Sequence, residues 1–192
     1  MSILWNSESR TLTLETAGTT YQMAVDRYGV LRHVYYGKKV SPADMMYLHR
    51  NYDRGFSGNP YESRNDRTYS LDAVCQEFSS CGVGDFRLPS LRVLSPDGSR
   101  CADLRYVRHE IRPGKYALPG LPAALDADGD AATLEAVLED PVCGLRARLL
   151  YSVLPKKDVI ARAVFTRIWE PRPWCWKRPA PAAWSCPSAP GT

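Results

Sequence analysis

Apolar and polar residues alternate over short segments of this chain, and this period of two restricts those segments to strands rather than helices. In residues 145–153 one face carries Leu145, Ala147, Leu149, Tyr151 and Val153. Successive side chains of a strand point to opposite faces, so such a segment presents one continuous apolar face to a core. The pattern predicts an all-β fold.

Similar segments recur along the chain with turn signals between them. Predicted strands cover residues 11–15, 20–25, 30–36, 68–71, 74–78, 90–94, 101–111, 133–139, 145–153 and 159–165. Turns are expected at 26–29, 95–98 and 140–144, a loop over 112–130, and a short helical turn over 42–49 with Ser41 as its cap. Short strands at close intervals indicate an antiparallel β-sandwich.

The composition changes near residue 167. Residues 169–192 hold four of the five tryptophans and six of the fifteen prolines, without any strand or helix period. Proline at this density prevents both a sheet ladder and a helix. The expected organisation is a β-sandwich domain over residues 1–166 and an irregular or disordered tail over 167–192.

Two explanations of the tail remain open. A run rich in Trp, Pro, Arg and Cys is typical of a GC-rich gene translated out of frame, which suggests a frameshift near Arg167. The alternative is a genuine recognition tail of an interaction protein. Sequencing the gene through this codon separates the two, because an uninterrupted frame ending at Thr192 contradicts the frameshift.

Bulk properties exclude several classes of protein. The net charge of +4 is modest and lies largely in the tail, so a nucleic-acid-binding face is not expected. No apolar run is long enough to cross a membrane. The six cysteines contain no C-x-x-C pair, so a structural zinc site is not expected. We expect a cytoplasmic protein with reduced cysteines partly buried as small apolar residues.

One stretch, residues 53–89, is denser in arginine, acidic, aromatic and glycine residues than a plain connection needs. Its segments include Asp53–Pro60, Asp66–Asp72, Gln76–Phe78 and Gly84–Pro89. Long loops of this composition usually serve binding. The equally weighted alternative is an irregular connection whose arginines and aspartates only satisfy each other.

These four segments resemble the amino-terminal domain of bacterial α-galactosidases of glycoside hydrolase family 36. Tyr35–Lys39, Asp103–Tyr106 and Leu118–Ala123 extend the resemblance, which runs in order from about Ile3 to Phe165. It implies a supersandwich-like β-sandwich that is incomplete here, because the chain resembles only about the first half of that domain.

The resemblance also sets expectations about activity. It implies a retaining hydrolysis of terminal α-galactosides of the melibiose and raffinose type, which needs two carboxyl groups and no metal or other cofactor. It places both carboxyl groups on a (β/α)₈ barrel that follows the sandwich, and no alternation of strands and helices occurs in this chain. We therefore expect no catalytic residue here and no activity from the chain alone.

The resemblance implies a contribution to binding instead. The loop over Asp53–Pro60 is expected to reach the active-site rim of a neighbouring subunit in a homo-oligomer. The implied substrate-binding residues are Asp53, Arg54, Phe56, Ser57, Asn59 and Pro60. Gly55 and Gly58 depart from the usual pattern and raise the entropy cost of ordering the loop.

Other candidate groups are weaker. Glu77 with Asp85, or Asp53 with Asp66, would supply two carboxylates, but nearby arginines favour structural ion pairs. His33, His49 and His109 are scattered, so neither a metal triad nor a nucleophile–base pair is expected. The acidic residues at 126, 128 and 130 suggest calcium, but a solvated turn is favoured because no closing glutamate follows.

The sequence thus predicts the non-catalytic amino-terminal part of an α-galactosidase, with open strand edges and marginal stability in isolation. Its alternative is a free-standing β-sandwich that binds carbohydrate or protein.

Overall fold

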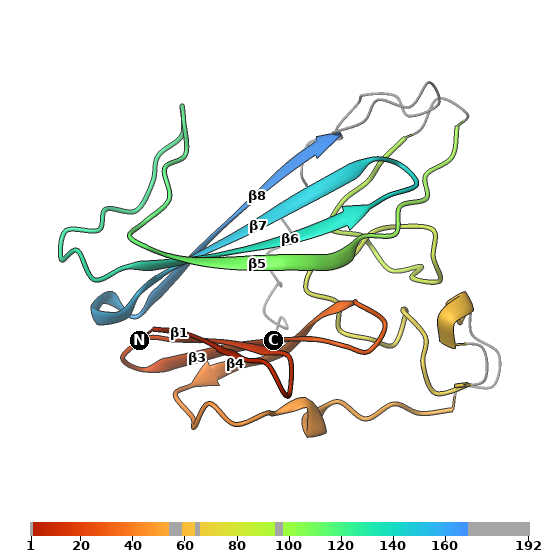
Figure 1. The fold of residues 1–192 in the computed structure, drawn as a ribbon, viewed down its shortest axis with the longest axis horizontal. Coiled ribbons are helices and arrows are strands. Elements are labelled where there is room, and N and C mark those ends of the chain that lie inside the picture. Colours follow the sequence, from red (N-terminus) through yellow and green to blue (C-terminus); the bar gives the residue numbers. More distant parts are fainter. Residues whose placement is uncertain (1, 54–58, 64–65, 95–97, 169–192) are drawn as a thin grey trace, which may run out of the picture.

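The computed structural model describes residues 2–53, 59–63, 66–94 and 98–168, which form two four-stranded antiparallel sheets (Figure 1). The first sheet contains β1 (Ile3–Asn6), β2 (Thr11–Glu15), β3 (Thr19–Val25) and β4 (Leu31–Lys38). The second contains β5 (Arg105–Pro113), β6 (Ala132–Asp140), β7 (Leu145–Leu154) and β8 (Val159–Ile168). Strands that follow each other in the chain are neighbours in each sheet. The predicted all-β antiparallel sandwich is confirmed.

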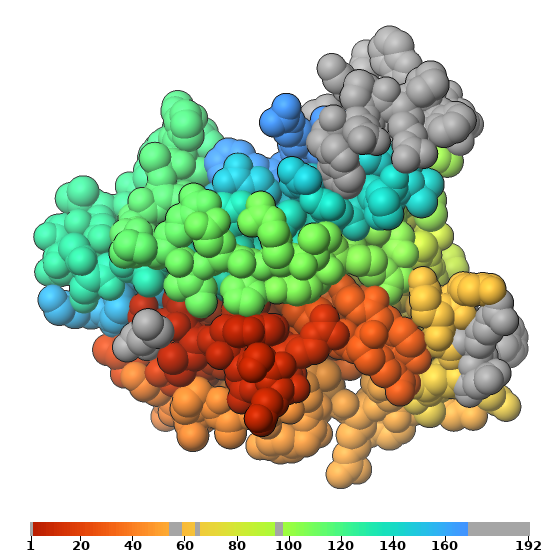
Figure 2. Space-filling view, in the orientation of Figure 1, coloured from red at the N-terminus to blue at the C-terminus, as the bar shows by residue number. Residues whose placement is uncertain are grey.

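The main core lies between the two sheets, because each sheet turns its apolar face toward the other. The buried residues of this core include Leu12, Leu14, Met23, Leu134, Leu138, Leu149 and Tyr151. Figure 2 shows the first sheet in red to orange and the second in green to blue as two layers in contact. The alternation that predicts strands therefore also identifies the residues of the core.

The outer face of the first sheet is covered as well, by residues 40–48. The fully buried Gln22 amide nitrogen donates to Thr13 Oγ1 and to the Ala43 carbonyl, both at 2.9 Å, and its oxygen accepts from the Met45 N–H at 3.0 Å. A buried amide without these partners would be costly. Gln22 therefore fixes this segment onto the sheet.

The helical turn expected over 42–49 is a single 3₁₀ turn, η1 (Met46–Leu48). Its N-cap is Met45, which makes no side-chain cap, so the predicted cap at Ser41 is wrong. Asp44 Oδ1 accepts from the Met46 N–H at 2.9 Å instead. Two further 3₁₀ turns occur at η2 (Tyr61–Ser63) and η3 (Pro155–Lys157).

Three predicted strands between the sheets are wrong. Residues 68–71, 74–78 and 90–94 form turns and irregular backbone, with isolated bridges only from Gln76 to Arg32 and from Leu91 to Ser80. Within 66–74 the chain turns twice, because Asp66 Oδ1 accepts from the Thr68 N–H and the Ser70 carbonyl accepts from two later N–H groups. Local bonds of this kind compete with a ladder.

The apolar residues of those segments instead form a small core of their own. Tyr69, Leu71 and Val74 are buried together with Val30, next to the turn that joins β3 and β4. In that turn Gly29 has φ +78°, as the turn signal predicts. The loop is thus packed against the end of the first sheet rather than paired with it.

The strands differ from the predicted ranges at several ends; the strand predicted over 101–111 is β5, which begins only at Arg105. β1 was not expected, because a segment of four residues carries too little alternation, yet it pairs with β2 through Ile3 and Leu14. β8 continues to Ile168, so Arg167 pairs with Arg146 of β7 and two residues of the predicted tail belong to the strand. Residues 169–192 and the predicted turn residues 95–97 lie outside the described part of the chain.

The described cysteines are less buried than expected. Cys75, Cys81 and Cys101 carry free thiols, and both Cys75 and Cys101 are exposed. Desolvation of the Cys101 thiol nevertheless raises its pKa. Among the described residues, no helix is both long and apolar enough to cross a membrane.

Candidate binding site

Three of the six residues expected to bind substrate can be placed. Asp53 lies at the surface with its carboxylate 3.3 Å from the Arg67 guanidinium. The Asn59 amide donates to the Asp66 carbonyl at 3.1 Å, and the buried Pro60 accepts at its carbonyl from the N–H and hydroxyl of Ser63, both at 2.9 Å. Arg54, Phe56 and Ser57 lie outside the described residues.

Asp66 connects the base of this segment to the β3–β4 turn. Its carboxylate accepts from the Thr68 hydroxyl at 2.5 Å and from the Thr68 N–H at 3.0 Å, and it forms an ion pair with Arg27. The Thr68 hydroxyl contributes most to lowering the pKa of Asp66. Asp53 and Asp66 are therefore each bonded to an arginine, and neither is held as a catalytic carboxylate.

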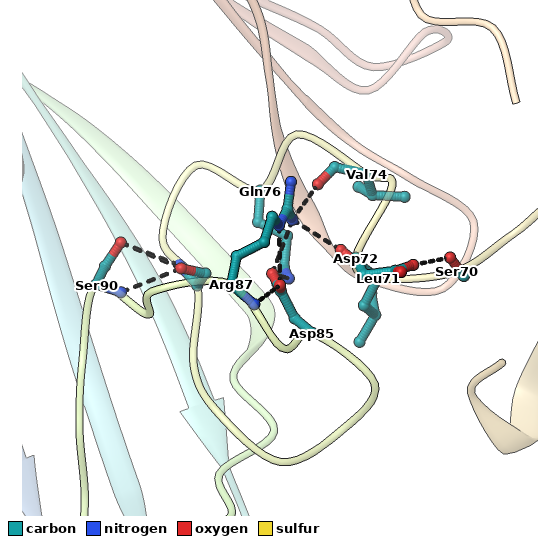
Figure 3. Close-up of polar contacts among 9 residues, drawn as sticks. Ser70, Leu71, Asp72, Val74, Gln76, Asp85, Arg87 and Ser90 are labelled. Atoms are coloured by element: carbon teal, nitrogen blue, oxygen red, sulfur yellow. Dashed lines mark hydrogen bonds and ion pairs between the residues drawn. The ribbon is translucent and has the colours of Figure 1, made fainter. Parts of the chain in front are cut away.

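Arg87 holds the next part of the stretch together (Figure 3). Its Nη2 donates to the carbonyls of Leu71 and Val74 at 2.8 and 2.7 Å, and its Nε donates to Asp85 at 2.9 Å. Gln76 donates to the other oxygen of Asp85 at 2.8 Å. Burial would raise the pKa of Asp85, but the bonds from Arg87 outweigh it and the pKa is lowered. We name Asp85 and Arg87 with these partners the Arg87 clasp.

Replacing Arg87 by alanine is expected to destabilise this loop. The change removes two charged hydrogen bonds to carbonyls and leaves the buried Asp85 without its cation, at a cost of about 1–2 kcal/mol for a guanidinium that is half exposed. Urea unfolding followed by circular dichroism measures the loss. Arg27→Ala is the matched control, because Arg27 is more exposed and donates to a surface carboxylate; equal losses in both variants would contradict the role of the clasp.

Glu77 occupies a different place, between the two sheets. It is completely buried and accepts from the hydroxyls of Tyr21 on β3 and Tyr151 on β7, each at 2.7 Å. Arg162 on β8 donates to it at 2.5 Å, and His33 on β4 lies 3.3 Å away. One carboxylate thus joins four strands of both sheets, and we name this group the Glu77 centre.

The charge state of the Glu77 centre follows from its contacts. Burial raises the pKa of Glu77, but hydrogen bonds from His33 and the tyrosines, together with the charge of Arg162, reverse the shift and lower it. Burial also raises the pKa values of Tyr21 and Tyr151, so both remain protonated donors. An ionised, fully bonded carboxylate of this kind is structural and is not available as an acid or nucleophile.

The other candidate groups are not brought together. Glu77 and Asp85 belong to the inter-sheet centre and to the Arg87 clasp respectively, so they do not face each other across a cleft. His49 bonds the Val34 carbonyl at 2.8 Å, and His109 lies against the Trp5 ring and bonds Tyr106. In the described part of the chain no group of three His, Cys, Asp or Glu residues is placed to hold a metal.

The partners of Glu77 were not predicted from the sequence. Arg162 was the available signal, because it lies on the same face of β8 as Ile160, which packs against the core. Its side chain is 41% exposed, but a charged residue on a face that packs against a core usually has a partner of opposite charge. No local pattern identifies Glu77 as that partner, since the two residues lie 85 positions apart.

Comparison with known proteins shows which family the chain resembles. The family model described as the glycosyl hydrolase family 36 N-terminal domain matches residues 29–172. The bifunctional α-galactosidase/sucrose kinase AgaSK of Mediterraneibacter gnavus is 49% identical over 164 residues, which is 85% of this chain and 17% of that protein.

Solved structures agree with the sequence comparison. The galactosidase domain of an α-galactosidase–sucrose kinase, AgaSK, superposes with a TM-score of 0.82 at 48% identity, over 86% of this chain and 23% of that one. A variant of the α-galactosidase AgaA of Geobacillus stearothermophilus in complex with raffinose gives 0.74 at 41% identity, over 80% and 21%. This chain therefore spans about a fifth of the length of the relatives it matches.

Proposed function

The chain belongs to the amino-terminal domain family of glycoside hydrolase family 36, and on this premise we propose that it serves as the non-catalytic amino-terminal domain of an α-galactosidase. The intact enzyme would hydrolyse terminal α-galactosides of the melibiose and raffinose type with retention. The observation that carries the proposal is the match of 49% identity over 164 residues to an α-galactosidase. The Glu77 centre and the Arg87 clasp supply structure, not chemistry, which fits a supporting domain.

We propose that the segment Asp53–Pro60 contributes to the rim of the active site in that enzyme. Asp53 presents a half-exposed carboxylate that can accept hydrogen bonds from sugar hydroxyls. The bonds at Asn59 and Pro60 fix one end of the segment on the Asp66 turn and on η2. The described ends of the segment therefore have defined contacts, as is common for binding loops that a scaffold positions.

A homo-oligomer and a cytoplasmic location are also part of the proposal. The connection between β4 and β5 carries several large exposed apolar side chains, which include Tyr47, Leu48, Tyr52, Tyr61, Phe86 and Leu88. Exposed apolar groups of this kind favour contact with another protein surface. The free thiols of Cys75, Cys81 and Cys101 are typical of a reducing compartment.

A domain exchange tests the proposal. Residues 1–166 of this chain replace the corresponding residues of the Mediterraneibacter gnavus α-galactosidase, and galactose release from raffinose is measured. We expect an active chimera and no activity from the 192-residue chain alone. When the chimera carries Asp53→Ala, we expect kcat/KM to fall about tenfold, which corresponds to a loss of 1.36 kcal/mol of transition-state binding. Leu125→Ala is the control, because Leu125 is 75% exposed in the loop before β6. A folded but inactive chimera, or hydrolysis by the isolated chain, would contradict the proposal.

A further inference from the structure

A surface depression of about 380 Å³ lies beside the anchored end of the Asp53–Pro60 segment. Three parts of the chain line it: Asn59 with the residues of η2, the loop before the Arg87 clasp, and the start of β5. Its volume falls within the roughly 300–1,000 Å³ that small-molecule sites occupy. These parts of the chain are the yellow to green regions in Figure 2.

Fixed polar groups form one wall of the depression. The Arg105 guanidinium donates to both oxygens of Asp103, at 2.6 and 2.9 Å, and to the Tyr28 carbonyl at 3.0 Å. Glu62 also lines the depression. Burial would lower the pKa of Arg105, but the bond to Asp103, with the charges of Asp103 and Glu62, raises it. This side of the depression therefore carries the carboxylates of Glu62 and Asp103, and a guanidinium that already donates to Asp103 and to a carbonyl. Such a surface favours a ligand with hydroxyl donors over an anion.

Two aromatic side chains, Tyr61 and Phe86, also line the depression. Phe86 is 82% exposed and Tyr61 is 74% exposed. Phe86 stands between Asp85 and Arg87, so the Arg87 clasp holds its backbone in place while the ring remains at the surface. An aromatic ring beside carboxylates matches a sugar, whose C–H face packs on the ring while its hydroxyls donate to the carboxylates.

We propose that this depression is a subsite for one neutral hexose unit of an α-galactoside oligosaccharide. Phe86 packs against the pyranose face, and Glu62 and Asp103 accept hydroxyl hydrogen bonds. The choice of α-galactosides rests on the proposed function, whereas the preference for a neutral sugar rests on the lining itself. The subsite shares Asn59 with the segment proposed to form the rim.

Ligand-observed NMR on the full 192-residue chain tests the subsite directly, with raffinose as probe and inorganic phosphate as the charged competitor. We expect weak raffinose binding that phosphate does not displace. Phe86→Ala is expected to weaken it by about tenfold and Glu62→Gln by several-fold. Val142→Ala is the control, because Val142 is 73% exposed in the turn between β6 and β7. Circular dichroism confirms that each variant is folded.

The outcomes separate this subsite from the proposed function. Binding that is lost in both subsite variants and kept in Val142→Ala supports the subsite, even when the chimera is inactive. An absence of raffinose binding, or binding that neither variant weakens, overturns the subsite even when the chimera hydrolyses raffinose. Displacement of raffinose by phosphate also overturns it, because the lining would then be an anion site.

Discussion

Replacing Glu77 by alanine is expected to lower the free energy of unfolding by about 3–5 kcal/mol, because it leaves two buried tyrosine hydroxyls without their acceptor and removes the volume of a buried side chain. The change removes the acceptor of two tyrosine hydroxyls and the partner of Arg162. Tyr151 is buried, so its hydroxyl would be left without the carboxylate that it now bonds. A domain of ordinary stability has only about 5–15 kcal/mol in total, so a loss of this size should clearly lower the midpoint of unfolding.

Two further variants, one at Glu77 and one at a control position, separate the effect of the charge from that of the shape. Glu77→Gln keeps the volume and one acceptor but loses the negative charge, so a smaller loss of about 1.5–3 kcal/mol is expected, as for a charged hydrogen bond. Glu139→Ala is the control, since Glu139 pairs with Arg146 near the surface and should cost under about 1 kcal/mol. Chemical unfolding measures all three. A loss from Glu77→Ala no greater than that from Glu139→Ala would show that the sheets pack without the centre.

Lowering the pH should also decrease the free energy of unfolding, because it protonates Glu77. The folded pKa of Glu77 lies below its unfolded value of about 4.3, so its contribution is complete above that pH and is lost as the pH falls through the folded pKa. Asp85 acts in the same direction. Unfolding measured in steps from pH 6 downward should therefore show stability decreasing below about pH 5, less steeply in Glu77→Gln. A wild-type stability independent of pH over this range would contradict an ionised centre.

Apart from β1, the strands of the two sheets follow from local pattern, because each carries its own alternation. In β7 the inward residues Leu145, Leu149 and Tyr151 can be recognised from the sequence without knowing the neighbouring strand. Turns such as 140–144 mark where the chain reverses direction between paired strands. The loop segments misled the prediction because Tyr69, Leu71 and Val74 also alternate in part, although they pack together in turns. Period alone does not distinguish a short strand from a turn with buried side chains.

The candidate site was less predictable, because its organisation depends on contacts between distant residues. The two interpretations of Asp53–Pro89 are resolved in part: Asp85 with Arg87 and Asp66 with Arg27 are structural pairs. The rings of Tyr61 and Phe86 are exposed and do not belong to the core. Sequence pattern identifies residue types that bind sugars, but only the fold brings η2, the Arg87 clasp and β5 to one depression.

Gly82→Ala is the second change expected to have a large effect, and its cause lies in the backbone. Gly82 has φ +103°, a conformation that an alanine adopts only with strain. An added Cβ would lie 2.7 Å from the Cys101 Cα and 2.8 Å from the Cys101 Cβ. Cys101 cannot withdraw easily, because the next residue, Ala102, is buried and donates to the Cys81 carbonyl at 2.9 Å. Strain and overpacking together should cost about 3–5 kcal/mol.

Gly120→Ala separates the two causes. Gly120 has φ +74°, and nothing lies within 4 Å of an added Cβ, so only the left-handed conformation is penalised, by about 1–2 kcal/mol. Adding Cys101→Gly to Gly82→Ala removes the overlap with the cysteine side chain but not the overlap with the backbone of residue 101, so it should recover only part of the loss. Thermal and urea unfolding of the variants measure these differences. Equal losses from Gly82→Ala and Gly120→Ala would mean that residues 101–102 move aside. Residues 81–82 would then not be fixed against the segment that leads into β5 of the second sheet.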